Sequence, residues 1–255
     1  TLDFVNKAYK RKIKVTKVDA ETEDKIKMKN IAFKIYDTIN DIYICPNENC
    51  LFKTDEEGSF TTDFLYPSIY ELEEIDQNIP GYTINKNKIT FEITKSTPEI
   101  LTIYFPNQRI TGEIIIEKID EQNTPIPNVI FTIYAAEDIF VNNKIIYYQN
   151  EEITSLKTDD QGLIHIENLP LGTYYLLETP VSGYLPLNEK IIIQLEYQDS
   201  NTSVITKKET IQNQKEVYEV PNTAKYTCEI PSTISYFERK RNEKKNTHPY
   251  PIVHK

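Results

Sequence analysis

The chain of 255 residues is long enough for about one to three domains with sizeable hydrophobic cores. Its formal net charge of −10 argues against nucleic-acid binding, and it has no run of about 20 apolar residues that could span a membrane. Valine, isoleucine, threonine and tyrosine are abundant, tryptophan is absent, and prolines and short turn signals separate the apolar runs, which favours an all-β chain.

The opening residues resemble a segment that occurs again later in the chain. The segment Leu2–Asn6 is similar in pattern to Ile103–Asn107, and in both places an asparagine precedes, by 11 residues, a lysine that ends an apolar, core-facing row. The sequence begins with Thr1 rather than with methionine and shows no signal peptide. We therefore expect a piece of a longer protein, with residues 1–7 as the last strand of a missing upstream domain.

The chain then contains an internal repeat. Five predicted elements occur in the same order in both copies: Ile13–Asp19 and Ile114–Asp120, Ile31–Tyr36 and Val129–Tyr134, Lys53–Gly58 and Lys157–Gly162, Ser68–Glu74 and Gly172–Glu178, and Leu101–Asn107 and Lys208–Asn213. The third pair is an acidic turn with a glycine available for a positive φ, and the other pairs are predicted strands.

Equivalent positions of the two copies lie 101 to 106 residues apart along the chain. A unit of that length with about seven short strands has the size of one immunoglobulin-like or transthyretin-like (prealbumin-like) β-sandwich. We predict two tandem domains at residues 8–110 and 111–216, followed by a disordered tail at residues 217–255.

Three cysteines are too few for a disulfide framework. Cys45 and Cys50 bracket a segment that is typical of a tip loop between two strands. They could close a small disulfide or stay reduced, and two thiolates are too few for a structural zinc site without further ligands. Cys228 is predicted to be unpaired, and we expect no metal site and no cofactor.

A lysine, a glutamate and an asparagine recur on the predicted core faces of both copies. Successive strand residues point to opposite faces, so each of these polar residues continues an apolar, core-facing row. The three residues are Lys17, Glu74 and Asn107 in the first copy, and Lys118, Glu178 and Asn213 in the second. Singly, such a lysine usually reaches water and such an asparagine usually makes a turn. Their recurrence in register favours the hypothesis that the three meet inside each domain.

Such a meeting would have a specific chemistry. Burial lowers the pKa of a lysine and raises that of a carboxylic acid. A neutral amine is a nucleophile, an asparagine amide is an electrophile, and a protonated glutamic acid can polarise the amide and shuttle protons until ammonia leaves. The product would be an isopeptide cross-link between the first and the last strand, made once per domain and resistant to pulling and proteolysis.

These residues also resemble a known family. Lys-x-Asp in the first strand, the acidic-turn glycine, and Gly-x-Tyr-x-Leu-x-Glu-Thr followed by Gly-Tyr are similar to the Cna B-type (SpaA-like, prealbumin-like) domains of Gram-positive pilins and adhesins. The resemblance covers roughly residues 8–216, in which the family pattern occurs twice. It implies spontaneous Lys–Asn bonds, with Glu74 and Glu178 as the catalytic residues; the spacing from the tyrosine favours Glu74 over Glu73.

The tail carries a second resemblance. Val220, Pro221, Asn222, Thr223 and Ala224 resemble the Leu-Pro-x-Thr-Gly signal that sortase cleaves, and the basic residues 238–245 resemble the tail of such a signal. Residues 225–237 between them are too short and too polar to cross a bilayer. The segment is either a degraded sorting signal or a charged tail.

The sequence therefore predicts the stalk of a Gram-positive, cell-wall-anchored, extracellular adhesin or pilin. Its expected partners are sortase and peptidoglycan through the tail, and a host ligand for the missing distal part. The alternative is a ligand-binding adhesin module that uses its sandwich loops, for which Phe140–Tyr148 is the candidate, although these residues more simply make a hairpin. The three histidines give no catalytic triad, so we expect no turnover enzyme.

Overall fold

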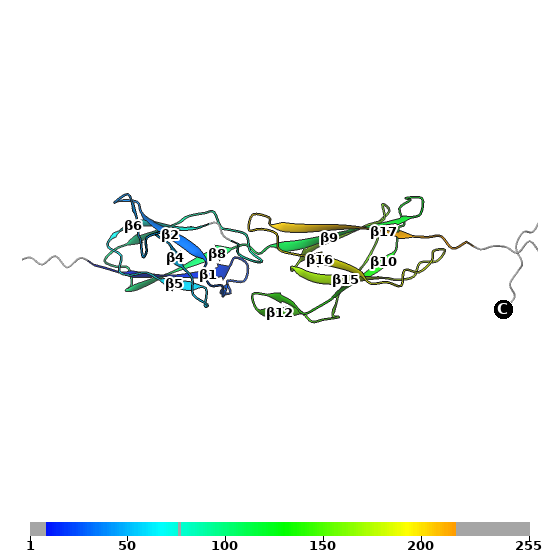
Figure 1. Ribbon diagram of the computed structural model, residues 1–255, viewed down its shortest axis with the longest axis horizontal. Coiled ribbons are helices and arrows are strands. Elements are labelled where there is room, and N and C mark those ends of the chain that lie inside the picture. Colours follow the sequence, from blue (N-terminus) through cyan, green and yellow to red (C-terminus); the bar gives the residue numbers. More distant parts are fainter. Residues whose placement is uncertain (1–8, 76–77, 218–255) are drawn as a thin grey trace, which may run out of the picture. The chain divides into compact units, whose positions relative to one another are not determined.

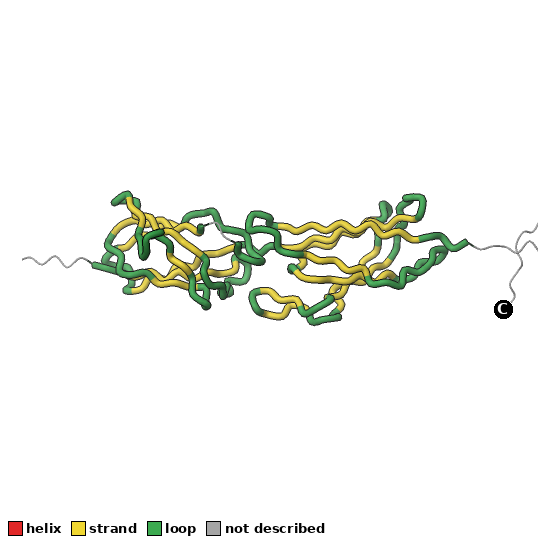
Figure 2. Tube along the Cα trace, in the orientation of Figure 1, coloured by secondary structure: helices red, strands yellow, loops and turns green. Residues whose placement is uncertain are grey.

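The computed structural model describes residues 9–75 and 78–217 of the chain. The predictions for residues 1–7, for the segment Val220–Ala224 and for Cys228 lie outside the described residues. Within these ranges the chain forms strands and loops and no helix (Figure 2), and hence no helix with the length and apolarity needed to span a membrane. The predicted all-β class is confirmed.

The first domain is a sandwich of two sheets (Figure 1). Its strands are β1 (Lys12–Asp19), β2 (Ala32–Asp37), β3 (Ile42–Tyr43), β4 (Phe52–Lys53), β5 (Ser59–Thr61), β6 (Ser68–Glu74), β7 (Ile89–Ile93) and β8 (Ile100–Asn107). The smaller sheet has the order β5-β1-β8, and the larger has the order β3-β2-β6-β7 with β4 also paired to β2.

The second domain repeats this arrangement and adds a hairpin. Its strands are β9 (Thr111–Asp120), β10 (Ile130–Ala135), β11 (Ile139–Val141), β12 (Lys144–Tyr147), β13 (Glu152–Lys157), β14 (Leu163–Leu169), β15 (Gly172–Glu178), β16 (Ile191–Leu195) and β17 (Val204–Asn213). One sheet has the order β14-β9-β17 and the other has the order β13-β10-β15-β16, while β11 pairs with β12. The two tandem sandwiches of the prediction are therefore both present.

The first and last strands of each domain lie side by side and run parallel. In the first domain β1 pairs with β8 so that Asp19 lies opposite Asn107. In the second, β9 pairs with β17 so that Asp120 lies opposite Asn213. Parallel strands cannot be joined by a tight turn, so the whole of each domain forms the connection between its two paired strands.

The last strand of the second domain is longer than the sequence predicts. The prediction starts it at Lys208, whereas β17 begins at Val204 and is paired with β9 along its full length. Residues 206–209 are polar and face outward or lie near the surface, so they give no apolar alternation that would mark a strand. Pairing with β9 decides the conformation here, rather than the local pattern.

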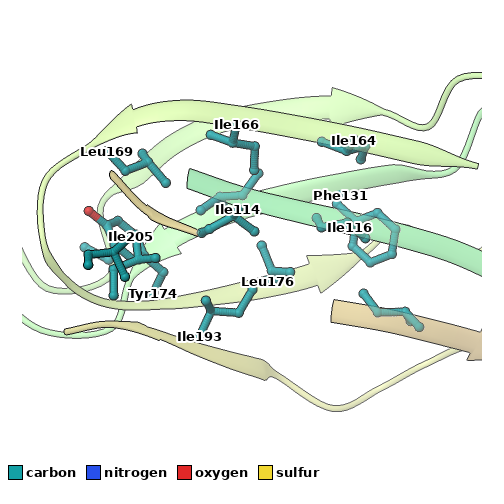
Figure 3. Close-up of a cluster of buried hydrophobic side chains, with 14 of the residues drawn as sticks. Ile114, Ile116, Phe131, Ile164, Ile166, Leu169, Tyr174, Leu176, Ile193 and Ile205 are labelled. Carbon is teal, nitrogen blue, oxygen red and sulfur yellow. The ribbon is translucent and has the colours of Figure 1, made fainter. Parts of the chain in front are cut away.

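Alternation of buried and more exposed residues builds both cores. The strand β9 follows a strict period of two, in which every second residue is buried, as expected for a sheet with one face against the core. Figure 3 shows the second core, to which both sheets contribute: Ile114, Ile116, Ile164, Ile166 and Ile205 from one, and Phe131, Tyr174, Leu176 and Ile193 from the other. The first core is more aromatic, with Phe33, Phe60, Tyr70 and Phe105 among its members.

The acidic turn of the first domain depends on an aspartate and a glycine. Asp55 Oδ1 accepts hydrogen bonds from the backbone N–H groups of Glu57 and Ser59, both at 3.0 Å. Gly58 has a φ of 71°, and a Cβ atom there would collide with the backbone carbonyl oxygen of Ile26. The glycine is therefore required both for the left-handed backbone and for a close approach between two chain segments.

We expect Gly58→Ala to lower the free energy of unfolding of the first domain by roughly 2–4 kcal/mol, because steric overlap with a backbone atom adds to left-handed strain. Gly81→Ala is the matched control, since Gly81 also has a positive φ of 82° but nothing within 4 Å of its would-be Cβ. It should cost about 1 kcal/mol. Scanning calorimetry of the two variants measures the difference; equal losses would contradict the proposed clash.

Candidate functional site

In the first domain, the side chains of Lys17, Glu74 and Asn107 meet in the core. Lys17 extends from β1, Asn107 ends the neighbouring β8, and Glu74 ends β6 of the opposite sheet. Lys17 Nζ donates a hydrogen bond to Asn107 Oδ1 and lies 2.6 Å from Glu74 Oε1. Asn107 Nδ2 donates to Glu74 Oε2 at 2.8 Å. Each of the three side chains therefore contacts the other two.

The second domain brings its three residues together in the same way. Lys118 Nζ donates a hydrogen bond to Asn213 Oδ1, and Asn213 Nδ2 donates to Glu178 Oε1. Lys118 Nζ lies 3.0 Å from Glu178 Oε2, close enough for an ion pair. That oxygen is buried and accepts no hydrogen bond within the described part of the chain, so the lysine is the group that faces its charge.

Strand geometry explains why these residues meet. Along the parallel pair β1 and β8, Lys17 lies opposite Phe105, so Asn107 is two residues further along and on the same face. In the opposite sheet Glu74 pairs with Phe33 of β2, which directs its carboxylate across the core. Glu73, the neighbouring acid, belongs to the other face of β6 and lies 3.7 Å from the exposed Lys88. The alternation therefore places Glu74 rather than Glu73 beside the lysine.

The three groups are screened from water. The side chains of Lys17, Glu74, Lys118 and Glu178 have no exposed surface, and Asn107 and Asn213 are buried. In the first domain, Lys17 Nζ lies 4.8 Å from the centre of the Phe105 ring and 5.6 Å from that of Phe33. Ring faces attract a cation without offering a hydrogen bond, so they hold the amine in place in a dry site.

Two backbone groups complete the first site. The backbone N–H of Asn85 donates to Glu74 Oε2 at 3.0 Å, and Asn107 Nδ2 also donates to the carbonyl oxygen of Thr83 at 2.9 Å. The amide of Asn107 is thus oriented with its nitrogen toward Glu74 and its oxygen toward the lysine. Its Cγ atom, the electrophilic centre of the amide, is next to the amine.

Burial shifts the lysines toward the neutral form. Burial lowers the pKa of Lys17 from 10.5 to about 8, although Glu74 works in the opposite direction. Burial also lowers the pKa of Lys118 below its ordinary value, again against the effect of Glu178. A lower pKa makes the neutral, nucleophilic amine easier to reach near neutral pH.

The structure describes two of the three other predicted sites. Cys45 and Cys50 are joined by a disulfide in the structure, in the loop between β3 and β4. The residues Phe140–Tyr148 form the hairpin β11–β12 and its flanks. Val220–Ala224 lies outside the described residues, so its resemblance to a sorting signal stays a prediction.

Sequence reasoning missed one group of possible metal ligands. One ligand atom from each of Glu113, His165 and Glu167 lies within 4.8 Å of the others. Glu113 and His165 come from the paired strands β9 and β14, so only their register brings them together. The imidazole of His165 is half exposed and already contacts Glu113 Oε1, so a direct contact between the two surface side chains explains the arrangement without a metal.

Comparison with known proteins identifies the family. The SpaA prealbumin-like fold domain matches the chain twice, at residues 11–107 and 112–210. The chain belongs to the SpaA prealbumin-like fold domain family. The first match contains all three residues of the first site; the second contains Lys118 and Glu178 and ends just before Asn213. The family resemblance inferred from the sequence motifs is thereby confirmed, together with two tandem domains of this fold.

Solved structures that match this chain come from several bacteria. The Bacillus anthracis TIE protein is 29% identical, with a TM-score of 0.57 over 80% of this SpaA-family chain and 34% of its own. GBS52, the minor pilin of Streptococcus agalactiae, is 18% identical, with a TM-score of 0.34 over 83% and 99% of the two chains. BcpA, the major pilin subunit of Bacillus cereus, is 13% identical, with a TM-score of 0.31 over 82% and 100%.

This chain therefore spans about a third of the length of the Bacillus anthracis protein. No curated protein matches the chain.

The lowered pKa of Lys17 gives the unlinked first domain a defined pH dependence. Between about 8 and 10.5 the unfolded chain binds a proton that the folded chain has released, so the free energy of unfolding rises with pH in this window. We compare an Asn107→Ala chain, which keeps Lys17 and Glu74, with an Asn107→Ala/Lys17→Met chain. Between about pH 7.5 and 9.5 we expect the Tm of the first chain to rise relative to the Tm of the second. Calorimetry measures both; parallel pH profiles would show that Lys17 does not titrate there.

Proposed function

We propose that this chain is the structural stalk of a Gram-positive cell-surface protein, an adhesin or pilin subunit, and that each domain is locked by an autocatalytic Lys–Asn isopeptide bond. The observation that carries the proposal is the contact, in both domains, between a buried lysine amine, an asparagine amide and a glutamate carboxylate. The linked residues are Lys17 and Asn107 in the first domain, and Lys118 and Asn213 in the second.

The reaction is an amide exchange in which every atom is accounted for. The lysine ammonium passes one proton to the adjacent glutamate carboxylate and becomes a neutral amine, which attacks Cγ of the asparagine. The glutamic acid returns its proton to the asparagine Nδ2 as the C–N bond breaks, and then takes a proton from the former lysine nitrogen. The products are a secondary amide, a protonated glutamic acid and one ammonia molecule, so no oxidant, metal or cofactor is consumed.

The arrangement favours this reaction through proximity. A nucleophile held in contact with its electrophile reacts as one molecule with itself, which can supply several kcal/mol toward the barrier. Glu74 and Glu178 contact both the amine and the leaving nitrogen, so one carboxyl group in each domain serves both proton transfers. Each domain reacts once, and turnover catalysis is not part of the proposal.

The bond would make the domain harder to unfold. Lys17 and Asn107 are 90 residues apart in the chain, and Lys118 and Asn213 are 95 residues apart. Closing a loop of this length with a covalent bond stabilises the folded state by about 4–5 kcal/mol when only the entropy of the unfolded chain is counted. It also keeps the first and last strands together under force, which suits a protein that carries another domain away from a cell.

The proposed location is extracellular and attached to the cell wall. Membership of the SpaA family supports a surface protein, and the sortase-like residues 220–224 supply the proposed link to sortase and peptidoglycan. A disulfide between Cys45 and Cys50 is consistent with an oxidising, extracellular environment.

The alternative function is that of a ligand-binding adhesin module. The observation in its favour is the hairpin of the second domain, where Phe140, Ile145, Ile146 and Tyr148 are exposed. Exposed apolar and aromatic side chains on a loop are a common way to bind a glycan or a protein. This alternative explains nothing about the buried polar residues, whereas the cross-linking proposal explains all six.

The intact mass of the reduced, denatured protein tests the cross-links directly. We expect a deficit of two ammonia masses, because each bond releases one. Glu74→Ala should leave a deficit of one, Glu178→Ala should also leave one, and the double variant should show none. Fragmentation of a proteolytic digest should find Lys17 joined to Asn107 and Lys118 joined to Asn213.

The matched control is Glu73→Ala. Glu73 is adjacent to Glu74 but pairs with the exposed Lys88 on the other face of β6, so its removal should leave both ammonia losses intact. A full-length mass with no deficit would overturn the cross-linking proposal and would favour the ligand-binding alternative.

Pulling single molecules from their two ends measures the mechanical consequence. In the parent protein the 90 and 95 residues enclosed by the bonds should contribute no extension. In the Glu74→Ala/Glu178→Ala chain each domain should unfold and release roughly 300 Å, from about 3.3–3.6 Å per extended residue. Two unfolding steps of that size in the parent would contradict a covalent link between the first and last strands.

A further inference from the structure

Each domain also contains a pair of oppositely charged residues that lies two residues beyond the lysine and the asparagine of the site. Asp19 follows Lys17 by two residues on β1, and Arg109 follows Asn107 by two residues just beyond β8. The separation from Lys17 to Asn107 and the separation from Asp19 to Arg109 are both 90 residues. A step of two residues on both strands keeps the same face, so the charged pair lies one step beyond the lysine and asparagine.

The contacts of the first pair are close and well formed. Arg109 Nη2 lies 2.9 Å from Asp19 Oδ2, and Tyr82 Oη donates to the same oxygen at 3.1 Å. Asp19 Oδ1 accepts hydrogen bonds from the backbone N–H groups of Glu21 at 2.9 Å and Thr22 at 3.1 Å. The aspartate is buried, so it fixes the turn after β1 with one oxygen and the chain after β8 with the other.

The second domain has an equivalent pair, with a lysine in place of the arginine. Asp120 Oδ2 lies 2.7 Å from Lys215 Nζ, and its Oδ1 accepts from the backbone N–H groups of Gln122 and Thr124, both at 2.8 Å. Lys215 follows Asn213 by two residues, as Arg109 follows Asn107. The hydrogen bonds from Lys215 and these N–H groups lower the pKa of Asp120 to about 2, so its charge is kept at any physiological pH.

The two basic residues are also held through their backbones. Arg109 forms an isolated bridge with Tyr82, and Lys215 forms one with Tyr184; both tyrosines belong to the Gly-Tyr segments that follow the glutamate strands. The end of the last strand is therefore fixed from two sides. Without such contacts a strand end frays, and the asparagine is the last residue of the strand in both domains.

We propose that Asp19–Arg109 and Asp120–Lys215 are positioning pairs, which hold the end of the last strand in register so that the asparagine amide stays against the lysine amine until the bond forms. This inference depends on the proposed cross-linking function. Neither pair touches the reacting atoms. Each pair acts by fixing the end of the last strand. The position of that end matters because a misplacement of about 1 Å at a reacting centre can slow a reaction by about a hundredfold.

The second domain offers the cleaner test, because Lys215 is partly exposed and is not one of the buried core residues. In a Glu74→Ala background only the second domain loses ammonia, so the intact mass reports one reaction. We expect Lys215→Met to slow ammonia loss by about ten- to a hundredfold after a pulse of cell-free synthesis. Lys215→Arg should restore a rate close to that of the parent.

The matched control is Lys208→Met. Lys208 is on β17 and forms a 2.8 Å ion pair with Glu117 of β9, so it joins the same two strands on the outward face. Its loss should leave the rate of ammonia loss unchanged. High salt should slow the parent and leave Lys215→Met unaffected, because salt screens a partly exposed pair that the variant lacks.

A Glu74→Ala/Glu178→Ala chain, which forms neither bond, separates positioning from stability. If Lys215→Met and Lys208→Met lower its Tm by similar amounts but only Lys215→Met slows the reaction, the positioning role is supported. An unchanged rate for Lys215→Met would overturn the inference while leaving cross-linking in place. No ammonia loss from the parent itself would instead overturn the proposed function, and this inference with it.

Discussion

The structure of each domain depends on a lysine amine that is held in the core beside a glutamate carboxylate. Burying two charges costs several kcal/mol per ion, and their mutual attraction often does no more than offset that cost, so such a pair is a poor device for stability alone. The placement of an asparagine amide in contact with both groups supports a different use for the pair. The proposed amide exchange would replace the ammonium and the carboxylate with a neutral amide and a neutral acid, and would release ammonia. It would thus remove the two charges whose burial is unfavourable.

The two sites share this geometry but differ in their surroundings. In the first domain the amine lies between the rings of Phe33 and Phe105, and backbone groups of Thr83 and Asn85 orient the amide and the carboxylate. In the second domain Phe131 is equivalent to Phe33, since each pairs with the glutamate of its site. The residue opposite the lysine differs, because Phe105 lies opposite Lys17 whereas Ile211 lies opposite Lys118. Aromatic enclosure is therefore not required for the three groups to meet. The strand register is what the two domains have in common.

Much of this could be predicted from the sequence, because a period of two places every second residue on the core face. That rule put Lys17, Glu74 and Asn107 inward, and it separated Glu74 from Glu73. It could not show that the first and last strands pair in parallel, since pairing between distant segments leaves no local pattern. For the same reason the Asp120–Lys215 pair and the group around His165 were missed. Each joins residues whose proximity depends on the register between two strands, and an exposed charge in the sequence does not identify its partner.

The parallel pairing also explains where the two copies are free to differ. A load applied along the chain enters each domain through its first strand and leaves through its last, and these strands are direct neighbours. With a covalent bond between them, the force passes from one strand to the other, and the remaining strands carry none of it. The disulfide-closed loop between β3 and β4 and the hairpin β11–β12 both lie in that unloaded part. Among the described residues each occurs in one of the two domains, whereas the paired first and last strands and the buried aspartate with its basic partner occur in both.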